Sequence, residues 1–319
     1  MRAAVLRELG RVPRVEEFPE PTPGDGEVLI RVRAAALKPV DRQMASGEHY
    51  ASPRELPVVC GSDGVGRLED GGRVFFGGPR RPYGSMAERT VVRKAQCFQI
   101  PETVDDDTAA AITNPGVSAW LSLKHSAKLN SGETVLILGA TGVTGRLAVQ
   151  IARILGARRV VAAGRNRDAL ASLRELGADA TIPLDCGRQE LTEAFRREAG
   201  QEGFDVIIDY LWGPPTEALL AAISRSEFAA AGPETRLVEV GESAGPTITL
   251  PAAVLRSAPV TIRGTAGIPA MDLLATAFQD VMSGAASGRL RMEIERIPLA
   301  DIESAWQRDA RPRRTVVVP

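Results

Sequence analysis

The sequence has few cysteines, almost no net charge and no long apolar run. Its three cysteines, Cys60, Cys97 and Cys186, are scattered without a C-x-x-C pair, so neither a disulfide framework nor a zinc knuckle is indicated. The formal net charge of −1 gives no electrostatic footprint for nucleic acid or an anionic membrane. No run approaches the ~20 apolar residues of a membrane span, and the N-terminal apolar run is too short for a signal peptide. We therefore expect a cytoplasmic protein that binds neither nucleic acid nor membrane.

The remaining composition is typical of a folded globular protein. Hydrophobic residues make up 44% and charged residues 25% of the 319 residues, so a packed core is expected. A chain of this length usually forms about two domains.

A glycine-rich turn within residues 134–145 is the clearest local signal. Thr134–Leu138 is a short β-branched and apolar run, as expected of a strand covered on both faces. Gly139, Gly142 and Gly145 then permit a tight turn, close approach of the backbone to a pyrophosphate and close packing of a helix on the strand. The glycines are spaced by threes, which departs from the common G-x-G-x-x-G. The segment predicts a dinucleotide-binding strand, turn and helix, and the alternative is a similar turn that binds nothing.

Strands and helices alternate after this turn, which predicts a parallel sheet with right-handed crossovers. Five further strands are predicted over 158–163, 180–182, 204–209, 236–240 and 260–263, with helices over 168–176 and 190–199. Before the turn, a helix starts in the acidic segment at Asp105. A second helix start is predicted at Asn114, with Pro115 in the first helical position and an end near Leu129.

Both ends of the chain carry β patterns. Val28, Ile30 and Val32 share one face of a predicted strand, and glycine turns separate the short strands that follow. Near the C-terminus an alternating segment over 290–295 continues the β character, and it precedes a predicted capped helix over 298–306 and a strand over 315–318. The pattern predicts a β domain made from both chain ends, with a Rossmann domain inserted between them.

Several short segments, taken in order, carry a family resemblance. They include Gly61-Ser-Asp-Gly-Val-Gly66, Tyr83-Gly-Ser-Met-Ala-Glu88, Asn114-Pro-Gly-Val-Ser-Ala-Trp120 and the stretch 132–145, and they continue through 176–179, 204–209, 238–241 and 298–306. Over nearly its whole length the chain resembles the medium-chain dehydrogenase/reductases, in the zinc-free, quinone oxidoreductase-like (zeta-crystallin-like) branch. The resemblance implies an α/β fold. A doubly wound Rossmann domain with six parallel strands would span 114–264, and a GroES-like β-barrel catalytic domain would combine 1–113 with 265–319.

Zinc can be tested against this resemblance. Zinc-binding members place a cysteine shortly before an Asp, a Gly-His-Glu in the next glycine-rich segment, and a lobe of four cysteines. Here Lys38 stands about where that cysteine would be, the second site reads Gly61-Ser62-Asp63, and the lobe is missing. The only histidines are His49 and His125, so a set of three protein ligands cannot be assembled and metal-free chemistry is expected.

The segment after the second predicted strand indicates the cofactor. About 20 residues past the glycine turn, an NAD site places Asp or Glu on the ribose, whereas an NADP site offers Arg to the 2′-phosphate. The chain reads Ala162-Ala-Gly-Arg-Asn-Arg167 there, so Arg165 is the best candidate, with Asn166 and Arg167 secondary. The alternative is that these arginines are solvated charges. NADPH is the expected cofactor.

The resemblance assigns the other cofactor contacts by position. Two segments, Val240-Gly241-Glu242 and Gly264-Thr265-Ala266, are expected to pass the nicotinamide and to hold its amide by backbone groups. The full predicted set is Asn114, Ser118, Gly139, Ala140, Thr141, Gly142, Val143, Thr144, Gly145, Gly164, Arg165, Asn166, Val240, Gly241, Gly264 and Thr265.

The resemblance also implies hydride transfer from NADPH to a quinone or an α,β-unsaturated carbonyl. Asp41, Ser62 and Asp63 are expected to line the cleft, although either Asp could be a structural turn residue. Tyr50, and His49 beside it, are the candidate proton donors, and the alternative for each is an ordinary loop residue. A Tyr and an Arg that often follow the matching Asp in quinone oxidoreductases are Gln43 and Ala45 here, which leaves quinone specificity open.

Two other functions remain open at this point. The protein could be an enoyl-thioester reductase acting on carrier-bound acyl groups, or an NADPH-binding sensor or structural protein without turnover. A homodimer through the edge strand 260–263 is expected, because family members commonly pair there and an open sheet edge needs covering.

Overall fold

The computed structural model describes residues 1–224, 234–265, 269–308 and 312–319. The chain forms two compact units. Unit 1 comprises Met1–Pro115 and Phe278–Pro319, and unit 2 comprises Gly116–Ala277. The chain passes between the units within α2 (Asp106–Trp120) and α8 (Met271–Ala286). No helix in the described ranges is long and apolar enough to cross a membrane.

Unit 2 is built on a parallel sheet with the strand order β11-β10-β9-β12-β13-β14. All five residues of β9 are buried, as its apolar sequence predicts. The chain leaves β9 toward β10 and β11, and then returns to the other side of β9 to form β12, β13 and β14. The boundary between β9 and β12 is therefore the topological switch point, where such folds bind ligands. The strands are β9 (Thr134–Leu138), β10 (Arg159–Gly164), β11 (Ala180–Pro183), β12 (Val206–Asp209), β13 (Thr235–Glu239) and β14 (Val260–Gly264). The predicted doubly wound sheet of six parallel strands is confirmed.

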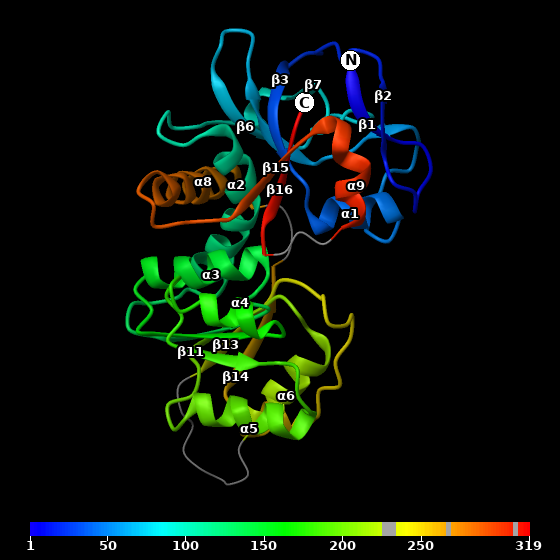
Figure 1. Ribbon diagram of the computed structural model, residues 1–319. Helices are drawn as coiled ribbons and strands as arrows, with labels where there is room; N and C mark the ends of the chain where they lie inside the picture. The colour runs from blue at the N-terminus through cyan, green and yellow to red at the C-terminus, as the bar shows by residue number, and fades with distance from the viewer. Residues whose placement is uncertain (225–233, 266–268, 309–311) are drawn as a thin grey trace. The chain divides into compact units, whose positions relative to one another are not determined.

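Helices cover this sheet on both sides, with α3 and α4 on one side and α5 and α6 on the other (Figure 1). In α5, Leu191 and Phe195 are buried four residues apart, which is the spacing of one helical face. The helices are α3 (Val143–Ile154), α4 (Arg167–Ser172), α5 (Arg188–Ala199), α6 (Gly213–Ile223) and α7 (Ala252–Ser257).

Unit 1 joins the two ends of the chain in one sheet. The C-terminal strand β16 (Arg314–Val318) pairs antiparallel with β3 (Glu27–Ala36), as Figure 1 shows in red and blue. The other strands are β1 (Arg2–Leu6), β2 (Arg14–Glu17), β4 (Val58–Val59), β5 (Asp63–Arg67), β6 (Arg73–Gly77), β7 (Arg89–Arg93), β8 (Cys97–Gln99) and β15 (Ile294–Pro298). The helical segments are α1 (Pro39–Ser46), η1 (Lys94–Gln96), η3 (Leu299–Asp301) and α9 (Ile302–Gln307).

The predicted second helix start at Asn114 is wrong. α2 runs without a break from Asp106 to Trp120 with Pro115 inside it, and it continues as a π-helical segment, η2 (Leu121–Ser126). Proline cannot donate a backbone hydrogen bond, but its local cost is outweighed here. Ile112 and Ala119, on either side of Pro115, are both completely buried, so packing holds the two halves in one helix.

The alternating segment over 290–295 is strand only from Ile294 onward. Leu290 instead lies in the turn that follows helix α8: its N–H donates to the Gly284 carbonyl at 2.9 Å and its side chain is buried. A side chain at Gly284 would lie 2.7 Å from the Leu290 side chain, so the two residues pack in contact. The first part of the alternating segment therefore belongs to the connection after α8, and only the part from Ile294 onward is strand.

Candidate functional site

The glycine turn forms a cradle at the carboxyl edge of the unit 2 sheet. Gly139 follows β9 with φ +80°, in the left-handed region that favours glycine. The N–H groups of Gly139 and Ala140 donate to the Ala163 carbonyl of the neighbouring strand, at 3.0 and 2.9 Å. A Cβ at Gly145 would lie 2.3 Å from the Gly139 oxygen, so only glycine fits there. Gly142 caps α3 without a side-chain hydrogen bond, which leaves the helix N–H groups open to an anion.

Thr141, Val143 and Thr144 complete this turn, and Gly164 closes it from the end of β10. A Cβ at Gly164 would lie 2.5 Å from the Thr141 side chain. The backbone is therefore packed closely on both sides of the turn, as the dinucleotide interpretation of the sequence requires.

The three polar residues after β10 differ in what they bind. Asn166 caps α4, because its side-chain oxygen accepts the Ala169 N–H at 2.9 Å. Arg167 donates two hydrogen bonds of 2.9 Å to Asp185. Arg165 is exposed, and its side chain makes no hydrogen bond or ion pair with any described residue. Of the two arginines, Arg165 is therefore the one whose guanidinium is open to a ligand.

The predicted nicotinamide segments lie at the same sheet edge. The Val240 and Gly241 N–H groups donate to the Asp209 carbonyl at 2.8 and 3.2 Å, and Thr265 donates from its N–H to the Glu239 carbonyl at 3.2 Å. Gly264 ends β14, whereas Ala266 lies outside the described residues. These backbone bonds join the end of β13 to the ends of its neighbours β12 and β14.

Ser118 and Asn114 both lie on α2. Ser118 is half-buried, and its carbonyl accepts the Ser122 hydroxyl at 2.8 Å. The Asn114 side-chain amide donates to Asp63 at 3.2 Å, so this predicted cofactor residue contacts a predicted catalytic one.

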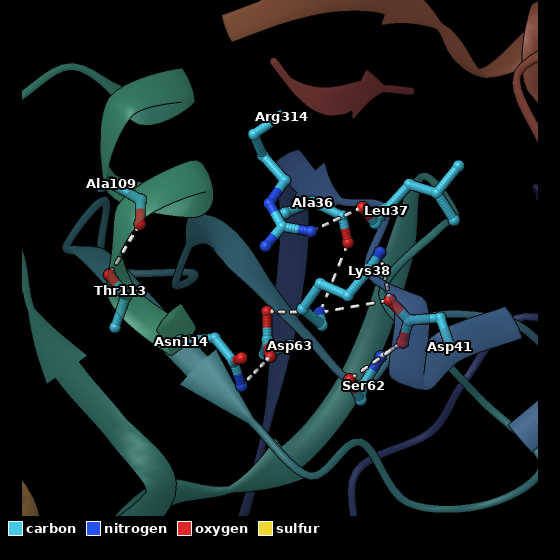
Figure 2. Close-up of polar contacts among 10 residues, drawn as sticks. All are labelled: Ala36, Leu37, Lys38, Asp41, Ser62, Asp63, Ala109, Thr113, Asn114 and Arg314. Carbon is cyan, nitrogen blue, oxygen red and sulfur yellow. Dashed lines mark hydrogen bonds and ion pairs between the residues drawn. The ribbon is translucent and has the colours of Figure 1, made fainter. Parts of the chain in front are cut away.

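In unit 1, three of the four predicted catalytic residues meet in a buried polar cluster (Figure 2). Asp41 Oδ1 accepts hydrogen bonds from the Ser62 hydroxyl at 3.0 Å and the Ser62 N–H at 3.2 Å. Asp63, at the start of β5, binds the Lys38 ammonium at 2.9 Å. Lys38 also lies 3.4 Å from Asp41 Oδ2, so one lysine joins both carboxylates.

Arg314 adds a second buried cation to this cluster. It donates to the Leu37 carbonyl at 3.0 Å, and its buried Nε has no hydrogen-bond partner in the part of the chain that the structure describes. Burial lowers the pKa of Arg314, and Asp41 and Asp63 oppose that shift. Two cations and two carboxylates thus share a low-dielectric environment, with their formal charges balanced.

Burial and the ion pairs together shift the pKa values of Lys38 and Asp63. It lowers the pKa of the Lys38 ammonium, but Asp41 and Asp63 outweigh it, so the pKa lies above its ordinary value. Lys38 is therefore charged at neutral pH. Burial raises the pKa of Asp63, and the Lys38 ammonium offsets this only in part.

Asp41 and Ser62 line a pocket of about 180 Å³ within unit 1. Cys60, Arg81 and Tyr83 also line this pocket, and most of the other lining residues are apolar. Burial raises the pKa of the Cys60 thiol to about 12, so the thiol is not a nucleophile at neutral pH.

Tyr50 lies apart from the cluster. It is 97% exposed and stacks on His49 with ring centroids 4.1 Å apart. No hydrogen bond within the described ranges links it to Asp41, Ser62 or Asp63.

Comparison with known proteins places the chain in a family. Residues 24–102 match the alcohol dehydrogenase GroES-like domain, and residues 143–279 match the family described as zinc-binding dehydrogenase. The quinone oxidoreductase of Sus scrofa is 34% identical over 60% of this chain and 59% of its own length. That of Homo sapiens is 32% identical over 65% of this chain and 68% of its own length.

A solved structure supports the same assignment over the full chain. The quinone oxidoreductase from Thermus thermophilus, also solved in complex with NADPH, superposes with a TM-score of 0.82 at 28% identity, covering 100% of both chains. A parallel six-stranded sheet of the Rossmann type combined with a GroES-like domain is typical of two-domain dehydrogenases and reductases. The chain belongs to the medium-chain dehydrogenase/reductase superfamily, in its quinone oxidoreductase-like branch.

The residues present do not fit the zinc implied by the family description. Where a cysteine ligand would stand, the Lys38 ammonium lies between two carboxylates. No group of three or more His, Cys, Asp or Glu side chains in the described part of the chain is placed to hold a metal ion. The buried positive charge of Lys38, in contact with Asp41 and Asp63, disfavours a second cation there.

Sequence reasoning missed the partnership of Lys38 and the presence of Arg314. Lys38 and Asp63 are 25 residues apart, and Arg314 and Leu37 are separated by 277. The only local signal is the spacing of Lys38 and Asp41, three residues apart at the start of α1. Contacts over such separations leave no periodic pattern in the sequence.

Proposed function

We propose that the protein is an NADPH-dependent oxidoreductase that reduces a quinone or an α,β-unsaturated carbonyl without zinc. The observation that carries the cofactor choice is Arg165, an exposed guanidinium directly after β10 that has no partner among the described residues. The NADPH complex of the Thermus thermophilus relative supports the same choice.

The unit 2 cradle fits a dinucleotide. Gly139, Gly142 and Gly145 would admit the pyrophosphate to the open N-terminus of α3, and Arg165 would bind the 2′-phosphate with a bidentate fork. Val240, Gly241, Gly264 and Thr265 would border the nicotinamide by backbone groups, with Asn114 and Ser118 as further contacts. When bound, NADPH would supply a hydride to an electrophilic carbon of the substrate.

The pocket of unit 1 is the proposed substrate site. Ser62 would contact the substrate oxygen through its hydroxyl, which Asp41 holds in one orientation. Asp63 would contribute by holding Lys38 and Asn114 in place, since it is buried and accepts a hydrogen bond from each of them. Tyr50 stays a candidate proton donor, and because it is exposed it would have to reach the substrate from the surface.

Steady-state kinetics with both nicotinamides test this function. We expect kcat/KM to favour NADPH. Arg165→Ala should reduce kcat/KM for NADPH by about 10- to 100-fold, as expected for the loss of a charge-assisted hydrogen bond, and leave NADH use unchanged. Arg167→Ala is the matched control, because Arg167 is bound to Asp185. A preference for NADH would refute the cofactor assignment.

A substrate panel separates this proposal from the alternatives. Quinones and enones should be reduced, whereas turnover of a crotonyl thioester without turnover of quinones would assign the protein to thioester reduction. NADPH binding with no oxidation by any member of the panel would instead indicate a sensor or structural protein.

We also propose a cytoplasmic homodimer that pairs through β14. In the described part of unit 2, β14 bonds only to β13, so its other edge is open. The three cysteines are free, which suits a reducing compartment. Sedimentation of the purified protein as a monomer would refute the dimer.

A further inference from the structure

The Lys38 side chain is placed as a bound cation would be. Only 2% of it is exposed, and its ammonium lies 2.9 Å from Asp63 Oδ1, 3.3 Å from the Ala36 carbonyl and 3.4 Å from Asp41 Oδ2 (Figure 2). An ammonium has three N–H donors, and three oxygens surround it here. The site is therefore complete with Lys38 in it.

The two carboxylates around the Lys38 ammonium are held in place by further hydrogen bonds. Asp41 Oδ2 accepts the Lys38 N–H at 2.9 Å, and Asp41 Oδ1 accepts both Ser62 donors. Asp63 Oδ2 accepts the Asn114 amide at 3.2 Å. Because each carboxylate is bonded on its second oxygen as well, the site has a fixed shape that does not depend on Lys38 alone.

We propose that the Lys38 ammonium is a tethered cation in the place where zinc-binding relatives would hold their metal, and that it positions Ser62 through Asp41. Lys38 pairs with both Asp41 and Asp63, and Asp41 in turn fixes the Ser62 hydroxyl at the pocket. Lys38 is a positioning residue, since it is too buried to touch a substrate. Once the Lys38 side chain is removed, the oxygens of Asp63, Asp41 and Ala36 that surround its ammonium form a binding site for a hard cation, here called the seat.

Manganese binding tests the seat without any turnover. Lys38→Ala exposes two carboxylates and a carbonyl, so we expect it to bind one additional Mn²⁺ per chain, measured by electron paramagnetic resonance. The wild type should lack this site, and Lys38→Ala/Asp63→Asn should bind Mn²⁺ about 10- to 100-fold more weakly than Lys38→Ala. Lys94→Ala is the matched control, an exposed lysine of the same unit. Equal Mn²⁺ binding by the wild type and a folded Lys38→Ala would overturn the proposal.

Kinetics test the positioning role, and this arm alone rests on the proposed function. Lys38→Ala should raise KM for the quinone and lower kcat, keep the wild-type affinity for NADPH, and recover turnover when Mn²⁺ is added. Wild-type quinone kinetics in metal-free Lys38→Ala would overturn the role of Lys38. If the wild type reduces no substrate, the proposed function fails while the Mn²⁺ result still stands.

Lys38→Met/Asp63→Asn covers the case in which Lys38→Ala does not fold in plain buffer. The double variant removes one charge of each sign and should fold. Lys38→Ala should then refold when Mn²⁺ is present. Failure of Mn²⁺ to rescue Lys38→Ala would overturn the seat, and quinone kinetics of the double variant equal to those of the wild type would overturn the positioning role.

Discussion

The candidate sites of the two units are built in opposite ways. In unit 2 the cradle is made of backbone, and its decisive feature is the missing Cβ at Gly145. In unit 1 the site is made of charged side chains that are buried and bonded to each other, around Lys38 and Asp63. The first site is open to an anion, and the second has neutralised its own charges. Substitutions should therefore act by steric overlap in unit 2 and by unpaired charge in unit 1.

The largest effect is expected from breaking the charge balance of unit 1. Asp63→Ala leaves the Lys38 ammonium with one carboxylate and leaves Arg314 in excess, so the free energy of unfolding should fall by about 3–5 kcal/mol. Urea denaturation measures the change. Glu16→Gln, at a surface ion pair with Arg7, is the control and should change the stability far less than Asp63→Ala does. An Asp63→Ala variant as stable as the wild type would show that the cluster is not balanced as described.

The next effect concerns the cradle of unit 2. Gly145→Ala places a Cβ 2.3 Å from the Gly139 oxygen, and overpacking of this kind costs about 1–3 kcal/mol of stability. Gly142→Ala is the matched variant, because its Cβ would meet only that same oxygen, at 3.4 Å. We expect Gly142→Ala to keep its melting temperature and bind NADPH more weakly, measured by tryptophan fluorescence. Equal melting temperatures for the two variants would contradict the steric account.

The smallest effect concerns a charged pair at the opposite, amino edge of the unit 2 sheet. Burial raises the pKa of Glu133, but hydrogen bonds from Arg236, at 2.6 Å, and Asn130 outweigh it, so the pKa lies below its ordinary value. A carboxyl with a lowered folded pKa contributes stability above its unfolded pKa and loses that contribution as the pH falls through the folded value.

Glu133→Gln should therefore cost about 1 kcal/mol at pH 7, the net value of one such hydrogen bond. The gap between variant and wild type should narrow as the pH falls below the unperturbed glutamate pKa of about 4.3. Urea melts at pH 7 and pH 4 measure it. A gap that stays constant with pH would mean that the ionised carboxylate is not the cause.

Much of unit 2 could be predicted from the sequence, because its signals are local. β9 and its glycine turn are adjacent in the chain, so four apolar residues after Thr134 and three glycines within 134–145 suffice to predict strand, turn and helix. The prediction failed at Pro115, where proline chemistry favours a helix start and the packing of Ile112 and Ala119 keeps one helix.

Unit 1 shows the limit of local signals. The sequence determined that Asp41, Ser62 and Asp63 are candidate site residues and that a cysteine position is occupied by Lys38. Only the tertiary structure decided that the Lys38 ammonium lies between both carboxylates and that Arg314, from the far end of the chain, joins them. The physical reason is that burial determines the pKa of a charged group and the free energy of leaving it unpaired. Burial in turn depends on which distant strands pair, here β3 with β16.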